Sequence, residues 1–194
     1  MYGGIIGFAT TPKNITSRVK VTSCINNGNM NVTLGRCSGI VATANCGVEM
    51  SSCTNNGDQV NAIANGRIAN ICCNISLDCS AKNCVNNGDI EATAASYGGT
   101  VGGMFALCGD DSVVIEGGGN YGTVKVPSTA TFKGLLSAQI TKCTSVKNVT
   151  ISGKMYVGGT LQSITASNYM DYVGTIAASY SSKVTGLTYV APTN

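Results

Sequence analysis

Hydrophobic and polar residues alternate along short stretches of the chain, and these stretches recur about every 30 residues. Each stretch follows a glycine, and the five glycines are Gly28, Gly57, Gly88, Gly122 and Gly153. Two residues after them stand Met30, Gln59, Ile90, Val124 and Met155, and four residues after them stand Val32, Asn61, Ala92, Val126 and Val157. Mostly polar residues lie between. A period of two residues predicts a strand with one buried face.

The second copy departs from this alternation. Its apolar residues are Val60 and Ala62, whereas Gln59 and Asn61 occupy the positions that are mostly apolar in the other copies. A shift by one residue reverses the two faces of a strand. This copy therefore predicts a bulge or irregular pairing.

A second recurring block lies between these strands. It consists of a glycine, two larger residues that are usually apolar, and a small residue. The copies are "GIIG" from Gly4, "GIVA" from Gly39, "GRIA" from Gly66, "GMFA" from Gly103 and "GLLS" from Gly134, with looser copies from Gly159 and Gly174. No continuous helical stripe is present, and frequent glycines disfavour helices. Each unit is therefore expected to contain a short apolar strand, a variable loop and an alternating strand.

A unit of this length without a helix must stack on its neighbours to bury its apolar face. We therefore expect an all-β fold, a parallel right-handed β-helix (β-solenoid) of about five to six coils over residues 3–177. Residues 1–158 would form the repeats, and residues 159–194 a last irregular coil and C-terminal cap. The alternative is an antiparallel sandwich in which each Asn-Gly pair closes a hairpin.

The asparagines before the glycines extend the same pattern. The blocks "CINNGN", "CTNNGD" and "CVNNGD" begin at Cys24, Cys53 and Cys84. Stacked coils lie about 4.8 Å apart, so side-chain amides at matched positions are expected to form a hydrogen-bonded ladder. Its members would be Asn26, Asn55, Asn86 and Asn120. The glycines that follow are expected to provide a positive φ at the corner, and the cysteines to form a column of core fillers.

The composition excludes several classes of protein. Only 11% of the 194 residues are charged, the formal net charge is +3, and Lys and Arg are scattered. This pattern argues against binding to nucleic acid or to an anionic membrane surface. No apolar stretch approaches the length of a membrane span, and the start "MYGGIIGFAT" lacks the features of a signal peptide.

The alternation of "GGIIG"-type blocks with "C-x-N-N-G-[ND]" blocks resembles the GLUG-type repeats of bacterial surface proteins, which are common in Bacteroidetes lipoproteins and in non-catalytic regions of secreted peptidases and adhesins. The likeness covers residues 3–177. It implies an extracellular or cell-surface location. Chlamydial polymorphic membrane proteins and repeat-rich protist surface proteins are similar to a lesser degree.

The chain contains ten cysteines. Cys46 and Cys73 each follow a block glycine by seven residues, and Cys72 and Cys108 follow theirs by six and five. These spacings would place them on adjacent coils, so they are candidates for disulfides in an extracellular protein. The alternative is that they are reduced core fillers. No metal site is expected, because zinc-type spacing and histidine are both absent.

Candidate catalytic groups are few. Without histidine there is no Ser-His or Cys-His couple. Asp110 and Asp111 in "CGDDSVV" are adjacent carboxylates that we interpret as a solvated turn, with acid–base chemistry or calcium binding as the alternative. No cofactor is expected, since the glycine-rich stretches do not match a phosphate-binding loop.

Two functions follow from these observations. The first is a non-catalytic cell-surface or secreted module, structural or adhesive, that presents loops to host glycans or proteins. The alternative is a carbohydrate-active enzyme on the same scaffold. Because the first coil begins with core-type sequence, we also expect one open end of the solenoid. That end would be covered by a longer parent chain or by self-association.

Overall fold

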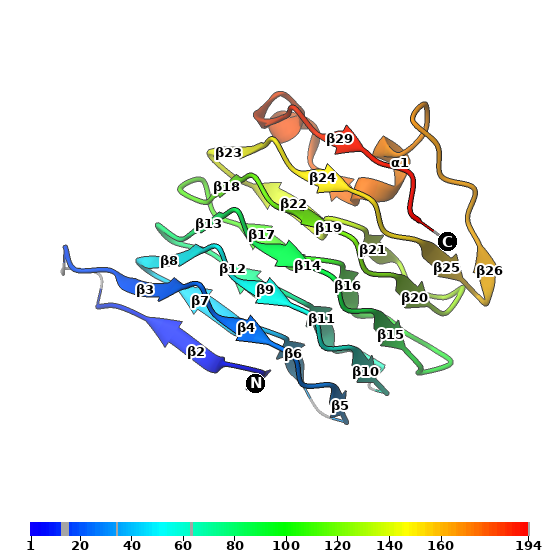
Figure 1. Cartoon of the computed structure of the whole chain (residues 1–194), viewed down its shortest axis with the longest axis horizontal. Helices are drawn as coiled ribbons and strands as arrows, with labels where there is room; N and C mark the ends of the chain where they lie inside the picture. The colour runs from blue at the N-terminus through cyan, green and yellow to red at the C-terminus, as the bar shows by residue number, and fades with distance from the viewer. Residues whose placement is uncertain (13–15, 34, 63, 194) are drawn as a thin grey trace.

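The computed structural model describes residues 1–12, 16–33, 35–62 and 64–193. The chain is all-β and winds as a solenoid of about five turns, in which each turn lies directly above the preceding one (Figure 1). Strands β4, β9 and β14, which end at the first ladder asparagines, pair in parallel. The parallel solenoid is therefore confirmed, and the antiparallel hairpins are wrong. The right-handed winding stays a prediction.

Among the described residues, each coil contributes five short strands. The first coil contains β1 (Tyr2–Gly3), β2 (Ile6–Thr10), β3 (Val19–Thr22), β4 (Ile25–Asn26) and β5 (Met30–Val32). The second contains β6 (Arg36–Ser38), β7 (Val41–Asn45), β8 (Val48–Ser51), β9 (Thr54–Asn55) and β10 (Gln59–Asn61). The third contains β11 (Arg67–Ala69), β12 (Cys72–Ile75), β13 (Ser80–Lys82), β14 (Val85–Asn86) and β15 (Ile90–Ala92).

The fourth coil contains β16 (Thr100–Gly102), β17 (Phe105–Gly109), β18 (Val114–Glu116), β19 (Gly119–Asn120) and β20 (Val124–Val126). The fifth contains β21 (Phe132–Gly134), β22 (Ser137–Lys142), β23 (Ser145–Lys147), β24 (Thr150–Ile151) and β25 (Met155–Val157). The remaining elements are β26 (Thr160–Leu161), α1 (Met170–Val173), β27 (Thr175–Ile176), η1 (Ala178–Lys183), β28 (Val184–Thr185) and β29 (Thr188–Tyr189).

Corresponding strands of successive coils form five sheets, and each sheet is named here by its first strand. The β1 sheet runs β1-β6-β11-β16-β21, and the β2 sheet runs β2-β7-β12-β17-β22-β27. The β3, β4 and β5 sheets follow the same rule and end at β28, β29 and β26. Strand β26 pairs antiparallel with β25, so it turns back along the edge instead of adding a coil.

The alternating strands lie in the predicted register. Met30 pairs with Gln59, Gln59 with Ile90, Ile90 with Val124 and Val124 with Met155. The bulge predicted in the second copy is wrong, because its pairing is regular and Gln59 and Asn61 point inward, with 1% and 0% of their surface exposed. The register instead shifts between Cys108 and Gly109.

The pattern of apolar residues failed in the second copy because the two buried amides donate hydrogen bonds inside the core. The Gln59 side chain donates from Nε2 to the Ala69 carbonyl at 3.0 Å and to the side-chain oxygen of Asn70. Asn61 Nδ2 donates to Cys37 Sγ at 3.4 Å. A buried polar side chain with partners is tolerated where an unpaired one is costly. Polar residues therefore occupy core positions here without a change of register.

The second block is in register in only part of the chain. Gly4, Gly39 and Gly103 share one column, in which the third coil places Asn70 and the fifth Leu135. The alignments that begin at Gly66 and Gly134 are therefore wrong, by four residues and by one residue. An asparagine in a glycine column concealed the third copy, because the Asn70 side chain turns away to donate to the Gly88 carbonyl at 2.7 Å.

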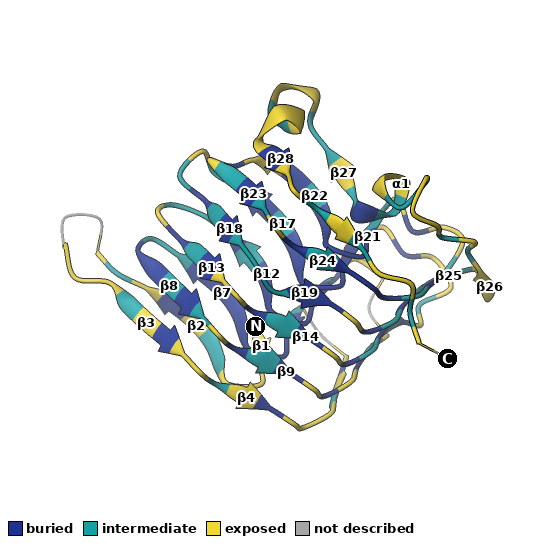
Figure 2. Cartoon of the chain, turned by 45° about the horizontal axis from the view of Figure 1, so that its top comes forward, coloured by how far each residue is buried: buried dark blue, intermediate teal, exposed yellow. Residues whose placement is uncertain are grey.

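The core is a continuous column of aliphatic, sulfur-containing and aromatic side chains inside the coils, drawn dark blue in Figure 2. One inner row consists of Ile5, Ile40, Ile71, Met104 and Leu136. Each coil buries its row on the next, and burial of such side chains supplies most of the stability. Ile5 differs from its row because 42% of its surface is exposed, whereas Ile40 is fully buried.

The two ends of the solenoid differ. At the N-terminal end, β1 to β5 are all edge strands, and the exposed large apolar residues there are Met1, Tyr2, Ile5, Phe8 and Ile25. At the other end, Tyr169 stacks on Tyr189 with 5.8 Å between ring centroids, and Val173 is fully buried. The described residues 159–193 thus cover much of the fifth coil (Figure 1).

Candidate functional site

The predicted asparagine ladder is present in the β4 sheet. Asn26 Nδ2 donates to Asn55 Oδ1 at 2.7 Å, Asn55 Nδ2 to Asn86 Oδ1 at 3.1 Å, and Asn86 Nδ2 to Asn120 Oδ1 at 2.7 Å. Each amide also donates to the carbonyl of the glycine two residues ahead, at 2.7–3.1 Å. The ladder ends at the fifth coil, where Ile151 pairs with Asn120.

The ladder glycines are required for a reason other than the one predicted. Gly28, Gly57, Gly88, Gly122 and Gly153 do not have a positive φ. A Cβ on Gly57 would lie 2.1 Å from the Gly28 carbonyl oxygen, and one on Gly153 would lie 2.5 Å from Asn120 Nδ2. The glycines therefore allow the coils and the ladder amides to approach closely.

The corner at which the backbone takes a positive φ lies immediately before Cys24, Cys53 and Cys84 in their coils. The residues at this corner on successive coils have φ between 51° and 68°, and they are Ser23, Ser52, Asn83, Gly117, Asn148 and Gly186. Serine and asparagine in this conformation are uncommon. Sequence reasoning missed this column because only two of its six members are glycine.

A second ladder on the surface was also missed. Asn56 Nδ2 donates to Asn27 Oδ1 at 2.7 Å, and Asn87 Nδ2 donates to Asn56 Oδ1 at 2.8 Å. The aspartates that follow the ladder glycines also connect coils. Asp58 Oδ1 accepts the backbone N–H of Asp89 at 2.8 Å, and Asp89 Oδ1 accepts that of Thr123 at 2.7 Å. The second asparagine of each "NNG" triplet was the available signal, because it recurs with the same spacing as the first.

The cysteines predicted as disulfide candidates are not brought together. All ten cysteines are free. Cys72 lies opposite Val41 and Phe105, whereas Cys108 lies opposite Ile75. Cys46 follows Asn45 at the end of β7, while Cys73 lies inside β12. The spacing argument failed because it counted from Gly66, which is four residues out of register with Gly39.

The adjacent carboxylates at the end of β17 have structural partners. Asp110 Oδ1 accepts the backbone N–H of Ser112 at 3.0 Å and its hydroxyl at 2.5 Å. Asp111 lies 3.4 Å from Lys142 Nζ and accepts a hydrogen bond from the Tyr180 hydroxyl. The bond from Tyr180, followed by that from Lys142, lowers the pKa of Asp111, and the same bond raises the pKa of Tyr180.

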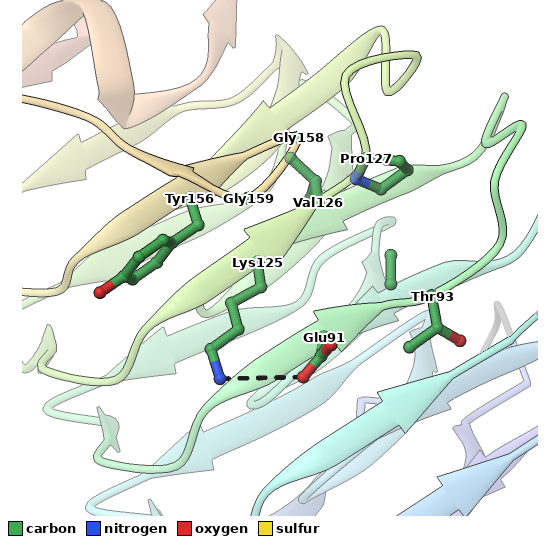
Figure 3. A pocket seen from close by; sticks show the side chains of 9 residues that line it. Glu91, Thr93, Lys125, Val126, Pro127, Tyr156, Gly158 and Gly159 are labelled. Carbon is green, nitrogen blue, oxygen red and sulfur yellow. Dashed lines mark ion pairs between the residues drawn. The ribbon is translucent and has the colours of Figure 1, made fainter.

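A hollow lies on the outer face of the β5 sheet. This groove has a volume of about 350 Å³, and its lining residues are Glu91, Ala92, Thr93, Lys125, Val126, Pro127, Tyr156, Gly158 and Gly159. Glu91 pairs with Lys125 and Lys125 with Tyr156 in the strand register, so the three side chains project from successive coils (Figure 3). Lys125 Nζ lies 3.7 Å from Glu91 Oε2.

The groove combines one aromatic ring with groups that donate and accept hydrogen bonds. Strand spacing separates successive side chains by about 4.8 Å, so the row from Glu91 to Tyr156 extends over about two spacings. Both members of the ion pair are roughly half-exposed, at 42% and 46%. Such a pair contributes little to stability and is free to exchange partners with a ligand.

Within the described part of the chain, no group of three or more His, Cys, Asp or Glu side chains is placed to hold a metal ion. No helix among the described residues is long and apolar enough to cross a membrane. Comparison with protein-family models, with curated proteins and with solved structures gave no match. Function is therefore inferred from the geometry and the repeats.

Proposed function

We propose that this chain is a non-catalytic structural and adhesive module of a secreted or cell-surface protein, and that the groove of the β5 sheet binds a glycan. The observation that carries the proposal is the outward row of Glu91, Lys125 and Tyr156 above the groove. The solenoid beneath the row holds it on paired strands, so the backbone positions of the three residues are fixed relative to one another.

A sugar ring matches the chemistry of this row. The Tyr156 ring has an apolar face for stacking and a polar hydroxyl at its edge. The Lys125 ammonium donates hydrogen bonds and the Glu91 carboxylate accepts them, so both bond to sugar hydroxyls. Because their ion pair is exposed, its rearrangement around a ligand costs little.

The carboxylates support a binding role over a hydrolytic one. Glycoside hydrolysis in most families uses two carboxyl groups that flank the scissile bond. Glu91 is the one carboxylate among the described residues that line the groove. Asp110 and Asp111 are bonded to Ser112, Lys142 and Tyr180 at another corner of the solenoid.

The proposed location is based on the repeats. The "C-x-N-N-G-[ND]" blocks at Cys24, Cys53 and Cys84 resemble GLUG-type repeats of bacterial surface proteins. As a spacer, the stack of coils would hold the groove away from the cell surface. A scaffold held by backbone ladders and by asparagine amides is suited to this spacer role.

Self-association through the N-terminal end is part of the same proposal. The five edge strands there leave N–H and C=O groups unpaired beside exposed apolar side chains. Edges of this kind favour pairing with another chain. A second copy, or the remainder of a longer chain, would cover the first coil.

The test is binding of the purified chain to immobilised neutral polysaccharides, measured by biolayer interferometry. Loss of an aromatic stack worth about 1 kcal/mol predicts that Tyr156→Ala weakens binding about fivefold to tenfold. Tyr121→Ala is the matched control, since Tyr121 is 47% exposed but lies at another corner. Equal binding by the two variants, or no retention of any polysaccharide, would contradict the proposal. Release of reducing ends that is lost in Glu91→Gln would instead show the carbohydrate-active alternative.

A further inference from the structure

The three cysteines of the "C-x-N-N-G" blocks form a column of thiols on adjacent coils. Thr22 pairs with Ser51 before the column and Ile25 with Thr54 after it, so Cys24 lies opposite Cys53. Ser51 pairs with Lys82 and Thr54 with Val85, so Cys53 lies opposite Cys84. The column occupies the corner between the β3 and β4 sheets (Figure 1).

The three thiols have matching orientations. Cys24, Cys53 and Cys84 each direct Sγ toward the carbonyl oxygen two residues earlier, at 3.5, 3.4 and 3.6 Å. The Cys53 thiol also interacts with the thiols of Cys24 and Cys84. The sulfur atoms therefore follow one another along the solenoid axis.

Core filling alone does not explain thiols at this position. Val149 occupies the same column in the fifth coil and is fully buried, so an aliphatic side chain fits there. The cysteines occupy the first three coils, next to the N-terminal edge. Cys24 is partly exposed, whereas Cys53 and Cys84 have 0% and 1% of their surface exposed.

We propose that Cys24 and Cys53 form a site of oxidation by hydroperoxides that joins the first coil to the second by a disulfide. The partly exposed Cys24 thiolate attacks the peroxide, becoming a sulfenic acid as the O–O bond breaks and alcohol or water leaves. The Cys53 thiolate then attacks that sulfur and displaces hydroxide, which gives the Cys24–Cys53 disulfide. Two electrons pass from the two thiols to the peroxide.

The geometry and the low pKa of Cys53 agree with the second of these steps. The strand spacing sets the Cα separation at about 4.8 Å, within the range of about 4.4–6.8 Å that disulfides allow. The hydrogen bond from the Cys84 thiol lowers the pKa of Cys53 to about 6. Cys53 is therefore the resolving thiolate, and Cys84 holds the proton, since that bond raises its pKa. Burial, followed by the charge of Cys53, raises the pKa of Cys24, so the first step depends on the access that its partial exposure gives to the peroxide and becomes faster as the pH rises.

The test is treatment of the reduced full-length chain with an equimolar amount of hydrogen peroxide, alkylation of the remaining thiols, and tryptic digestion without reduction. Cys24 lies in the tryptic peptide 21–36 and Cys53 in the peptide 37–67, which also contains Cys37 and Cys46. We expect mass spectrometry to find these two peptides linked, with fragmentation placing the bond between Cys24 and Cys53. Cys46→Ser should retain the link and Cys53→Ser should abolish it.

Two results would overturn the proposal. One is a linked product whose bond ends at Cys37 or Cys46. The other is Cys24 oxidised to sulfinic or sulfonic acid while Cys53 is alkylated as a free thiol. Both are scored on the unmodified chain, so the conclusion does not depend on the folding of the Cys53→Ser variant.

Discussion

The side-chain amide of Asn55 donates at 3.1 Å to Asn86 Oδ1 on the next coil, while its own oxygen accepts from Asn26 on the preceding coil at 2.7 Å. The same Nδ2 also donates to the Gly57 carbonyl at 2.7 Å. Asn55 is fully buried. One side chain thus connects three coils inside a buried corner, where hydrogen bonds are strong and unpaired groups are costly.

Asn55→Ala should destabilise the fold by about 3 kcal/mol. The change removes two hydrogen bonds from Nδ2 and leaves Asn26 Nδ2 without its Asn55 acceptor, and each buried group left unpaired costs about 1–3 kcal/mol. Urea denaturation followed by circular dichroism measures the loss. Asn56→Ala is the control, because Asn56 belongs to the exposed ladder, and it should cost no more than about 0.5 kcal/mol. Equal losses in the two variants would show that the buried ladder contributes nothing special.

Gly57→Ala should destabilise the fold by about 2–3 kcal/mol. Its Cβ would lie 2.1 Å from the Gly28 carbonyl oxygen, so the first two coils must separate, and overpacking of this kind usually costs 1–3 kcal/mol. Gly109→Ala is the matched control, since its Cβ would meet only ordinary contacts at 3.6 Å or more. The measurement is the urea concentration at the midpoint of unfolding for each variant. A midpoint for Gly57→Ala that is no lower than that for Gly109→Ala would disprove the close-approach explanation.

The protein should lose stability above about pH 9. Burial raises the pKa of the Cys72 thiol to about 12. A group whose pKa is higher in the folded state contributes stability that is complete below its unfolded pKa of about 9 and is lost as pH rises toward 12. At pH 10 this thiol should cost about 1.4 kcal/mol.

Cys72→Val should remove that part of the alkaline loss, because valine does not ionise and Val41 occupies the same column. The measurement is the difference between the free energies of unfolding at pH 7 and pH 10, taken for both chains under a reducing agent without oxygen. An unchanged difference would show that Cys72 does not ionise on unfolding in this range.

Ile5→Lys should weaken self-association. Ile5 belongs to an inner row whose next member, Ile40, is fully buried, yet 42% of Ile5 is exposed at the N-terminal edge. A charge there must be desolvated when a second chain docks on the edge. Light scattering across a concentration series measures the molar mass. Leu161→Lys is the control, since Leu161 is 52% exposed on β26, away from that edge. A wild-type chain that stays monomeric at all concentrations would refute the docking proposal.

Much of the architecture could be predicted because equivalent residues stack directly on one another. The columns that begin at Met30 and Asn26 were aligned correctly, since every coil places its member of each column at the same distance from a glycine. Prediction failed where a coil substitutes a residue of another kind. Asn70 in a glycine column and Gln59 in an apolar column each appear out of place along the chain, although they bond to each other across the core.

The sequence by itself determined that the chain is a stack of similar coils with a buried amide ladder, because a period of about 30 residues and a period of two within each strand leave few other ways to bury the apolar face. Only the tertiary structure decided at which glycines a Cβ would clash with the next coil, which serines and asparagines take a positive φ, and which cysteines lie opposite one another on adjacent coils. It also placed Glu91, Lys125 and Tyr156 in one row. These properties depend on contacts between residues about 30 positions apart, and the exact register of those contacts is set by packing between coils.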